Sequence, residues 1–258
     1  MSYYDDTFYQ WVNATARNSA RVILPIVAGQ ARPASVVDVG CGQGAWLEHW
    51  AELGVRDVYG VDGGHVDTAR LLIPSERFQV ADLARPFDIG RRFDIAQSLE
   101  VAEHLPAEVG PSFVQSLCKL SDIVLFSAAR PGQGGERHIN ERAPSYWARL
   151  FASNGYVVFD SIRPCLLDKK EVSPWYRYNS FLYANAEGRR RLSGLDSSGQ
   201  VSSLRRLDST GDWKWDARCL LLRPLPEPVV TWLSRQRYRH VIKSGKLAGT
   251  ALKAGARS

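Results

Sequence analysis

Short apolar runs recur along the first 186 residues of the chain and alternate with longer stretches that mix apolar and polar positions. The runs, which have the length and composition of strands, lie at residues 35–40, 57–61, 77–81, 93–98 and 121–127. The mixed stretches, which have the composition of helices, lie near residues 44–53, 64–72 and 106–119. This alternation predicts an α/β fold in which helices cover a parallel sheet and ligands bind at the carboxyl ends of the strands.

The same pattern continues beyond the fifth predicted strand. A short helix is expected over residues 144–151, and it is followed by apolar and aromatic runs at 156–159 and 178–183. We expect these two runs to be the last strands, so that the sheet has seven strands in all. Residues 35–186 are therefore assigned to one α/β domain.

The segments that flank this domain differ from it in composition. Residues 1–34 begin with five aromatic side chains and contain an apolar helix around residues 22–27, and they either pack on the sheet edge or form a lid. Residues 187–258 hold 15 Lys and Arg against 6 Asp and Glu, a net charge of +9. Because the whole chain has a net charge of +6, residues 1–186 carry −3, so only the C-terminal extension is basic.

A further helix is predicted near residues 228–243, where apolar positions are interspersed with Arg and Lys. Such a helix would contact an anionic surface, a second copy of the chain in a homodimer, or its own domain. Nucleic acid is not expected as a partner, because the domain lacks the positive surface that a phosphate backbone requires.

The hydropathy of the chain and the spacing of its cysteines indicate the cellular compartment in which we expect the protein. No stretch is long and apolar enough to span a bilayer, and the first residues do not form a secretory signal. The four cysteines are Cys41, Cys118, Cys165 and Cys219, and no two of them form a C-x-x-C pair. We therefore expect no structural zinc, and we expect a cytoplasmic protein with reduced thiols.

A glycine-rich turn joins the first predicted strand to the first predicted helix. Val36, Val37 and Val39 form the strand, and the turn runs from Gly40 to Gly44. Glycines allow the backbone to approach a ligand closely, and the amides at the start of the following helix point toward it. This arrangement predicts a nucleoside site, which on spacing alone would also fit a dinucleotide.

An acidic residue inside the strand separates these two alternatives. Asp38 lies two residues before Gly40 at the strand end, where a carboxylate would repel a pyrophosphate but attract an ammonium or sulfonium group. A cationic cofactor is therefore favoured over a dinucleotide, although Asp62 lies where a dinucleotide site also places its ribose-binding acid.

At these residues the chain resembles the class I S-adenosylmethionine-dependent methyltransferases, whose first motif is similar to residues 37–44. Residues 58–62, 78–83 and 92–100 resemble, in order, the second, third and fourth strands of that family with the loops that follow them. The resemblance implies a Rossmann-like, doubly wound, mostly parallel seven-stranded sheet whose last strand is antiparallel. It also implies that S-adenosylmethionine is the cofactor.

The resemblance further assigns roles to individual side chains. Asp62 would hold the ribose hydroxyls and Asp82 would accept from the adenine amino group. The complete set of cofactor-binding residues that we expect is Asp38, Gly40, Cys41, Gly42, Gly44, Asp62, Asp82, Leu83 and Ser98.

The loop after the fourth predicted strand contains the candidate catalytic residues. Glu100, Glu103 and His104 are spaced by three and four residues, so that they converge on one side of a helical turn, and His138 follows the fifth strand. Oxygen and imidazole ligands suit a divalent cation such as Mg²⁺ or Mn²⁺. Similar E-x-x-E-H runs, completed by a later histidine, mark metal-using O-methyltransferases of ubiquinone biosynthesis and of small-RNA 3′ ends.

The same residues offer a mechanism without metal. Similar runs are also common in methyltransferases that bind none, and Pro106 disfavours helical geometry just before it. His104, or else His138, would then act as the general base, with Glu100 or Glu103 orienting the imidazole ring.

Acceptor recognition leaves the weakest signal in the sequence. Aromatic residues at 146–147 and 175–178 suit a saccharide or a phenolic compound, though most would equally serve the core. We therefore expect a methyltransferase that acts on a hydroxyl of a saccharide or another small molecule. Two alternatives remain open: methylation of the RNA ribose 2′ hydroxyl, and a methyltransferase-like binding module without catalysis.

Overall fold

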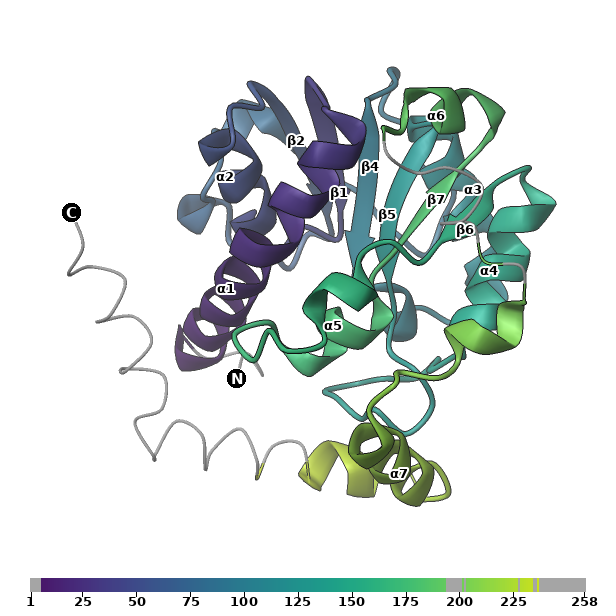
Figure 1. The fold of residues 1–258 in the computed structure, drawn as a ribbon. Coiled ribbons are helices and arrows are strands. Elements are labelled where there is room, and N and C mark those ends of the chain that lie inside the picture. The colour runs from purple at the N-terminus through teal and green to yellow at the C-terminus, as the bar shows by residue number, and fades with distance from the viewer. Residues whose placement is uncertain (1–5, 194–200, 202, 227, 234–235, 237–258) are drawn as a thin grey trace.

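A computed structural model describes residues 6–193, 201, 203–226, 228–233 and 236 of the chain. Within these ranges seven strands form one sheet in the order β3-β2-β1-β4-β5-β7-β6 (Figure 1). The strands are β1 (Ser35–Val39), β2 (Asp57–Asp62), β3 (Phe78–Val80), β4 (Ile95–Leu99), β5 (Ile123–Ser127), β6 (Val157–Phe159) and β7 (Phe181–Ala184).

Strand direction matches the prediction. Strands β1 to β5 run parallel to one another, whereas β7 runs antiparallel to both of its neighbours, β5 and β6. The expected seven-stranded, mostly parallel sheet with an antiparallel last strand is therefore confirmed. The carboxyl ends of β1, β2 and β4 meet at one edge, where this topology places its ligands.

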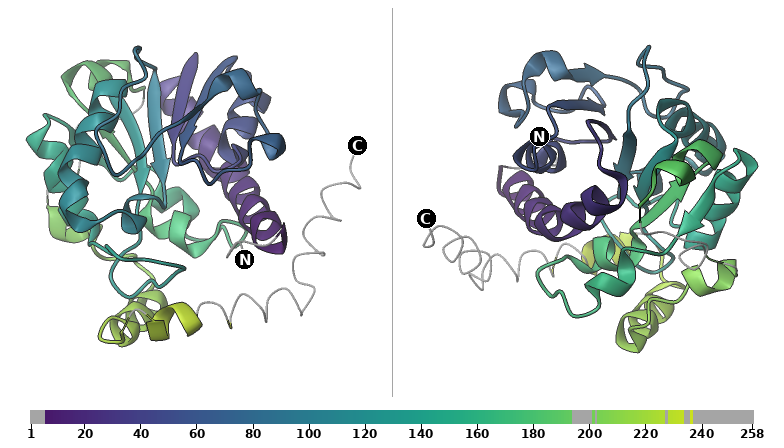
Figure 2. Two further views of the ribbon diagram at one scale, coloured as in Figure 1. Left: turned by 180° about the vertical axis from the view of Figure 1, so that it is seen from behind. Right: turned by 45° about the horizontal axis from the view of Figure 1, so that its top comes forward.

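Burial on both faces explains why the strands read as continuous apolar runs. Successive side chains of a strand point to opposite faces, so Val36 packs in one hydrophobic cluster and Val37 in the other. Helices cover both faces of the sheet (Figure 2) and supply many of the other residues of each cluster. One face is covered by α1 (Asp6–Ala31), α2 (Ala45–Glu52) and α5 (Pro174–Asn179), and the other by α3 (Gly110–Leu120) and α4 (Pro144–Ser153).

The N-terminal helix α1 is longer than the sequence indicated. Its buried side chains recur every three or four residues, as one face of a packed helix requires; they are Ala16, Ala20, Ile23, Leu24 and Val27. On another side, Asn13 Nδ2 donates to Gln43 Oε1 at 2.6 Å. Helix α1 therefore packs on the sheet layer and also contacts the glycine-rich turn.

The prediction of a helix near residues 64–72 was wrong. Only a single 3-10 turn forms, at Thr68–Arg70, and the Asp67 side chain caps it by accepting from the Ala69 amide. The chain then runs extended across the glycine-rich turn, where Leu72 N donates to the Gln43 carbonyl at 2.8 Å. Pro74 disfavours helical geometry in the residue before it, so this segment cannot continue as a helix.

The start of the last strand was also predicted too early. Residues 174–179 form helix α5 instead, because Pro174 occupies the first helical turn, where its missing amide costs nothing. Strand β7 begins only at Phe181. Of the strand predicted over residues 178–183, Tyr178 and Asn179 therefore belong to this helix.

The C-terminal extension contains α6 (Ala186–Arg191) and α7 (Trp213–Leu222). Of the helix predicted over 228–243, residues 228–233 are helical and nearly all of the remainder lies outside the described residues. The extension contacts the domain directly: the Asp208 carboxylate accepts from the amide and the hydroxyl of Ser145, each at 2.9 Å. The boundary expected at residue 187 stays a prediction. No described helix has the length and hydropathy needed to cross a membrane.

Candidate active site

The glycine-rich turn forms a tight connection at the carboxyl end of β1. Gly40, Gly42 and Gly44 all have positive φ angles, of 83°, 54° and 91°. A Cβ atom on Gly40 would lie 2.3 Å from Val101 Cγ2, whereas no described atom lies within 4 Å of the same position on Gly42. The turn is therefore packed on one side by the loop after β4 and open at Gly42, where a ligand can approach the backbone.

Asp62 ties the end of β2 to this turn. Its Oδ2 atom accepts from the Gly42 amide and its Oδ1 atom from the Gly63 amide, both at 2.6 Å. Burial raises the pKa of this carboxyl, and the two amides oppose that shift. The predicted ribose-binding acid thus lies directly beside the glycines, with its carboxylate fixed in place.

Asp38 is buried inside β1, with only 2% of its surface exposed. Burial raises the pKa of its carboxyl to about 7, and the nearby Asp62 adds to the shift. The side-chain amide of Gln97, its cross-strand neighbour on β4, opposes it. A cation bound near Asp38 would favour the ionised carboxylate, so this site suits a positively charged ligand.

The remaining predicted cofactor residues occupy different environments. Asp82 and Leu83 follow β3; Asp82 is exposed and accepts from the Ala84 amide at 3.0 Å, whereas Leu83 is buried. Ser98 lies inside β4 with no partner for its hydroxyl among the described residues. Cys41 is buried in the turn, and burial holds the pKa of its thiol well above the usual value. The structure thus joins Asp62 to the glycines by a hydrogen bond, places Asp38 close enough for Asp62 to raise its pKa, and places Asp82 at the next strand end.

Glu100 begins the loop after β4 in a strained conformation, with φ of +58°. Its amide donates to the Ser127 carbonyl at 3.0 Å, which ties it to the end of β5. Its carboxylate accepts from Gln133 Nε2 at 2.6 Å and from Asn179 Nδ2 at 3.3 Å. Both Glu100 oxygens are therefore occupied by amide donors.

The carboxyl oxygens of Glu103, in contrast to those of Glu100, accept no hydrogen bond from the described residues. The Glu103 side chain is also completely buried. Burial and the neighbouring Glu100 hold the pKa of this carboxyl well above its usual range. Buried oxygens without hydrogen-bond partners are costly, so the carboxyl group of Glu103 is the group in this loop that a ligand would stabilise most.

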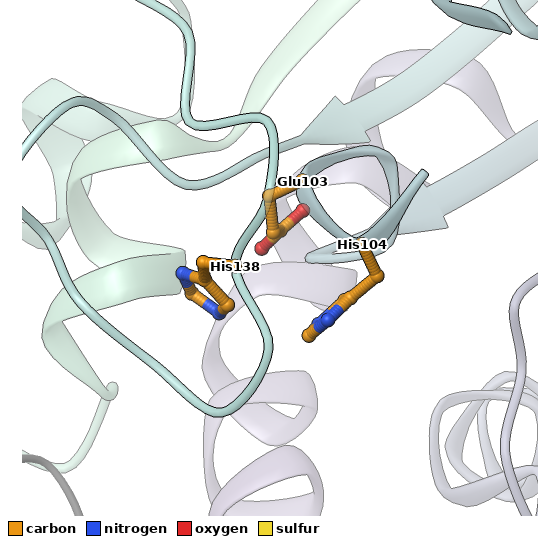
Figure 3. Close-up of side chains that lie close together, drawn as sticks. All are labelled: Glu103, His104 and His138. Atoms are coloured by element: carbon orange, nitrogen blue, oxygen red, sulfur yellow. The ribbon is translucent and has the colours of Figure 1, made fainter. Parts of the chain in front are cut away.

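Two histidines face this carboxylate. Glu103, His104 and His138 each offer one ligand atom, and these atoms lie within 4.8 Å of one another (Figure 3). The His104 and His138 rings are 4.9 Å apart and nearly perpendicular. Surrounding protein atoms and the neighbouring imidazole lower the pKa of His104 to about 4, although part of its ring is exposed. Two imidazoles beside a carboxyl group whose oxygens have no hydrogen-bond partner among the described residues fit a divalent cation.

Glu141 is a site residue that the sequence analysis missed. Its Oε1 atom lies 3.0 Å from Nδ1 of His138, and its oxygens also accept from the Gly132 and Gly134 amides at 2.7 Å. Glu141 therefore positions both the imidazole and the loop before it. Its place three residues after His138 was the only signal available in the sequence.

A buried arginine connects the site to the C-terminal extension. Arg130 donates to Asn179 Oδ1 at 2.9 Å, to the Tyr178 carbonyl at 2.8 Å and to the Asp208 carbonyl at 3.0 Å. Because Asn179 in turn contacts Glu100, residues from the loops after β4 and β5, from α5 and from the extension form one polar network. Sequence reasoning missed this network because its members are far apart along the chain.

The predicted acceptor-binding aromatics do not form one surface. Trp147 is buried against Phe126, Tyr176 packs edge-on against Trp46, and the Tyr178 hydroxyl donates to Asp212 at 2.7 Å. A cavity of about 130 Å³ instead lies between the loop at Gly132 and the C-terminal helices, and it reaches His138.

Comparison with known proteins identifies the family of this chain. The profile of one protein family, described as a methyltransferase domain, matches residues 7–176. None of the curated proteins matches the sequence.

Several solved structures share the fold. A sugar N-methyltransferase from Streptoalloteichus has 16% identity and a TM-score of 0.50, over 70% of this chain and 92% of its own. Magnesium protoporphyrin IX methyltransferase from Synechocystis, with bound S-adenosylhomocysteine (SAH), has 19% identity and a TM-score of 0.50, over 68% and 84%. An O-methyltransferase family protein from Burkholderia thailandensis has 16% identity and a TM-score of 0.51, over 69% and 59%.

Proposed function

Because this chain belongs to the methyltransferase-domain family, we propose that it transfers a methyl group from S-adenosylmethionine to a hydroxyl of a saccharide or another small molecule. The observation that carries the proposal is the contact between the Asp62 carboxylate and the Gly42 amide at the open side of the glycine-rich turn. A sugar N-methyltransferase among the similar structures supports a saccharide acceptor.

The residues at the carboxyl ends of β1 and β2 fit this cofactor. Asp62 would accept from the ribose hydroxyls with lone pairs that its two amide donors leave free, and Asp82 would accept from the adenine amino group. Asp38 would stabilise the positive charge of the methionine part. When bound, S-adenosylmethionine supplies an electrophilic methyl group on its sulfonium sulfur.

A hydroxyl acceptor must also lose a proton, and His138 is the best placed base. Glu141 accepts from its Nδ1 atom, which leaves the other ring nitrogen available and stabilises the imidazolium that forms. His104 is less suitable, because its lowered pKa makes it a weak base. Glu100 would orient Gln133 and Asn179 next to the acceptor rather than take the proton itself.

A divalent cation bound beside His138 would assist the removal of this proton. Glu103, His104 and His138 would hold Mg²⁺ or Mn²⁺, with Glu100 as a further oxygen ligand if its amide partners moved. The partnerless oxygens of Glu103 support this proposal. Such an ion would act as a Lewis acid that favours ionisation of the hydroxyl.

Methyl transfer from labelled S-adenosylmethionine tests the proposed function. The acceptors should include free sugars, nucleotide sugars, phenolic compounds and a short RNA, and the protein should be compared with the His138→Ala variant. We expect a sugar or phenolic acceptor to be labelled, and turnover to fall on the order of 10²-fold in the variant. Labelling of RNA alone would favour the ribose methyltransferase alternative.

Failure to label any acceptor despite cofactor binding would favour the binding-module alternative. The full chain should be used, because Arg130 connects the C-terminal extension to the site. We place this activity in the cytoplasm, where the four free cysteines would stay reduced.

A further inference from the structure

The outer side of α7 is apolar and exposed. Trp213, Leu220 and Leu221 have 75%, 69% and 75% of their surfaces exposed. They are spaced by seven and eight residues, which places them on one side of the helix. On the opposite side, Trp215 and Cys219 are buried against Tyr178. This helix therefore has two apolar sides, of which only one is covered within the described residues.

The helical residues 228–233 repeat this arrangement. Thr231 is buried, and its hydroxyl donates to the Gly135 carbonyl at 3.1 Å, so this side faces the loop before His138. Val229, Trp232 and Leu233 are exposed. Both helices lie at the same end of the molecule in every view (Figures 1 and 2). We call the exposed set the C-terminal apolar surface: Trp213, Leu220, Leu221, Val229, Trp232 and Leu233.

Among the described residues, the exposed charges on and directly after α7 are positive; Glu227, which precedes the second helix in the sequence, lies outside the described residues. Lys214 and Arg223 are exposed on and after α7. The two acidic residues of this element are engaged within the protein: Asp212 caps α7 and accepts from Tyr178, and Asp216 accepts from Thr210. Their negative charges are therefore partly compensated by protein donors.

The sequence that follows adds only positive charge. Residues 234–258 contain seven Lys and Arg and no Asp or Glu. Two copies of such a segment would repel each other across a symmetric dimer, whereas an anionic surface would attract both the segment and the exposed bases.

We propose that the C-terminal apolar surface docks on a membrane surface that contains anionic lipid. Tryptophan and leucine side chains enter the boundary between headgroups and acyl chains, while the Lys and Arg residues contact the lipid phosphates. The loop that carries His138 packs directly against α7, since a Cβ atom on Gly132 would be 1.9 Å from the Cys219 carbonyl oxygen. This docking is independent of the proposed methyl transfer.

Vesicle co-sedimentation of the full chain tests this proposal. Phosphatidylcholine vesicles with one third phosphatidylglycerol should bind the protein, pure phosphatidylcholine vesicles should bind it weakly, and added salt should release it. Leu221→Asp and, separately, Trp232→Ser should each reduce binding on the order of tenfold, because each removes one inserted side chain.

The matched control is Leu53→Asp, which changes an exposed leucine at the end of α2 and should leave vesicle binding unchanged. Circular dichroism should show the same melting temperature for all variants, because the changed side chains are exposed. Equal binding to both vesicle types, or equal loss in Leu53→Asp and Leu221→Asp, would overturn the proposal.

Two other occupants are distinguished by the same variants. A homodimer in light scattering that Leu221→Asp dissociates would show that a second copy covers the surface. Binding of short RNA that Leu221→Asp abolishes, without binding to anionic vesicles, would assign the surface to nucleic acid. Either result would contradict docking on lipid.

Discussion

Glu141 holds His138 through the Nδ1 atom of the imidazole, with 3.0 Å between that nitrogen and Oε1 of the carboxylate. The same carboxylate accepts from the amides of Gly132 and Gly134, which belong to the loop that leads to His138. One side chain therefore fixes the tautomer of the imidazole, the orientation of its ring and the course of the loop.

The first prediction concerns this carboxylate. Glu141→Ala should lower turnover by about 10- to 100-fold, the usual cost of removing a group that orients a ligand or a base, and should leave cofactor affinity unchanged. Steady-state kinetics and calorimetric titration measure the two quantities. Glu108→Ala, which changes an exposed carboxylate, is the control and should have normal turnover. Normal turnover in Glu141→Ala would exclude this role.

The second prediction follows from the buried Asp38, whose carboxyl has a pKa of about 7 in the folded protein. Since this pKa is raised, the folded state binds the proton more tightly than the unfolded state between about pH 4 and pH 7. The free energy of unfolding should therefore fall as pH rises through this window, with a slope from this group of at most about 1.4 kcal/mol per pH unit.

Urea unfolding of the wild type and of Asp38→Asn at a series of pH values measures this slope. The variant should lose less stability as pH rises, while Asp88→Asn, at a carboxyl on the surface, should follow the wild type. Identical pH dependence in Asp38→Asn and the wild type would contradict a raised pKa at Asp38. Conversely, binding of a cationic cofactor should strengthen as pH rises through about 7, because the ionised carboxylate attracts it.

The third prediction concerns the partnerless carboxylate of Glu103. If a divalent cation is held there, EDTA should abolish turnover, and Mg²⁺ or Mn²⁺ should restore it with cofactor affinity unchanged. Glu103→Gln should weaken Mn²⁺ binding, measured by calorimetry, by at least about 10- to 100-fold. That is the usual loss of affinity when a residue that only supports a metal ligand is changed, and Glu103 would itself be a ligand. Full activity in EDTA would leave His138 to act as a base without metal.

The fourth prediction concerns Gly132, where the loop touches α7. A Cβ atom there would lie 1.9 Å from the Cys219 carbonyl oxygen, and φ is +82°. Gly132→Ala should therefore destabilise the protein by about 1–3 kcal/mol or more in urea unfolding. Gly54→Ala is a matched control, because Gly54 has φ of +93° but no described atom near its Cβ position, and it should cost only about 1 kcal/mol.

Equal destabilisation in the two glycine variants would mean that the contact between the loop and α7 adds nothing to stability. Greater destabilisation in Gly132→Ala would show that the C-terminal extension stabilises the domain. It would also place the extension in the same cooperative unit as residues 35–186.

The sequence predicted the sheet well because its strands are buried on both faces. Runs such as residues 35–40 and 121–127 are mostly apolar, and this composition can be recognised from the local sequence alone. The segment at 64–72 was misread because its backbone is directed by a bond from Leu72 to Gln43 on another element. The start of the last strand was placed three residues too early, at Tyr178, because an aromatic residue favours a strand, whereas Pro174 starts a helix that extends to Asn179.

In the candidate site, too, the sequence indicated what depends on local patterns and missed what depends on contacts between distant residues. Asp38, Asp62 and the glycines lie at the ends of predictable strands, so the sequence indicated their proximity, and the structure places Asp62 in contact with Gly42. The link from Arg130 through Asn179 to Glu100 joins residues separated by 49 and 79 positions, and no local pattern marks it. Glu141 was missed because a carboxylate three residues after a histidine is common on solvated loops.

Calorimetric titration with SAH is the most direct measurement, because the proposed methyl transfer depends on a nucleoside cofactor at Gly42 and Asp62. The wild type should bind one equivalent and should not bind NAD. Asp62→Asn, which keeps one oxygen for the turn amides, should weaken binding by about tenfold, as expected for a lost charge-assisted hydrogen bond, while Asp88→Asn should not. Binding of NAD without SAH, or unchanged affinity in Asp62→Asn, would contradict this account.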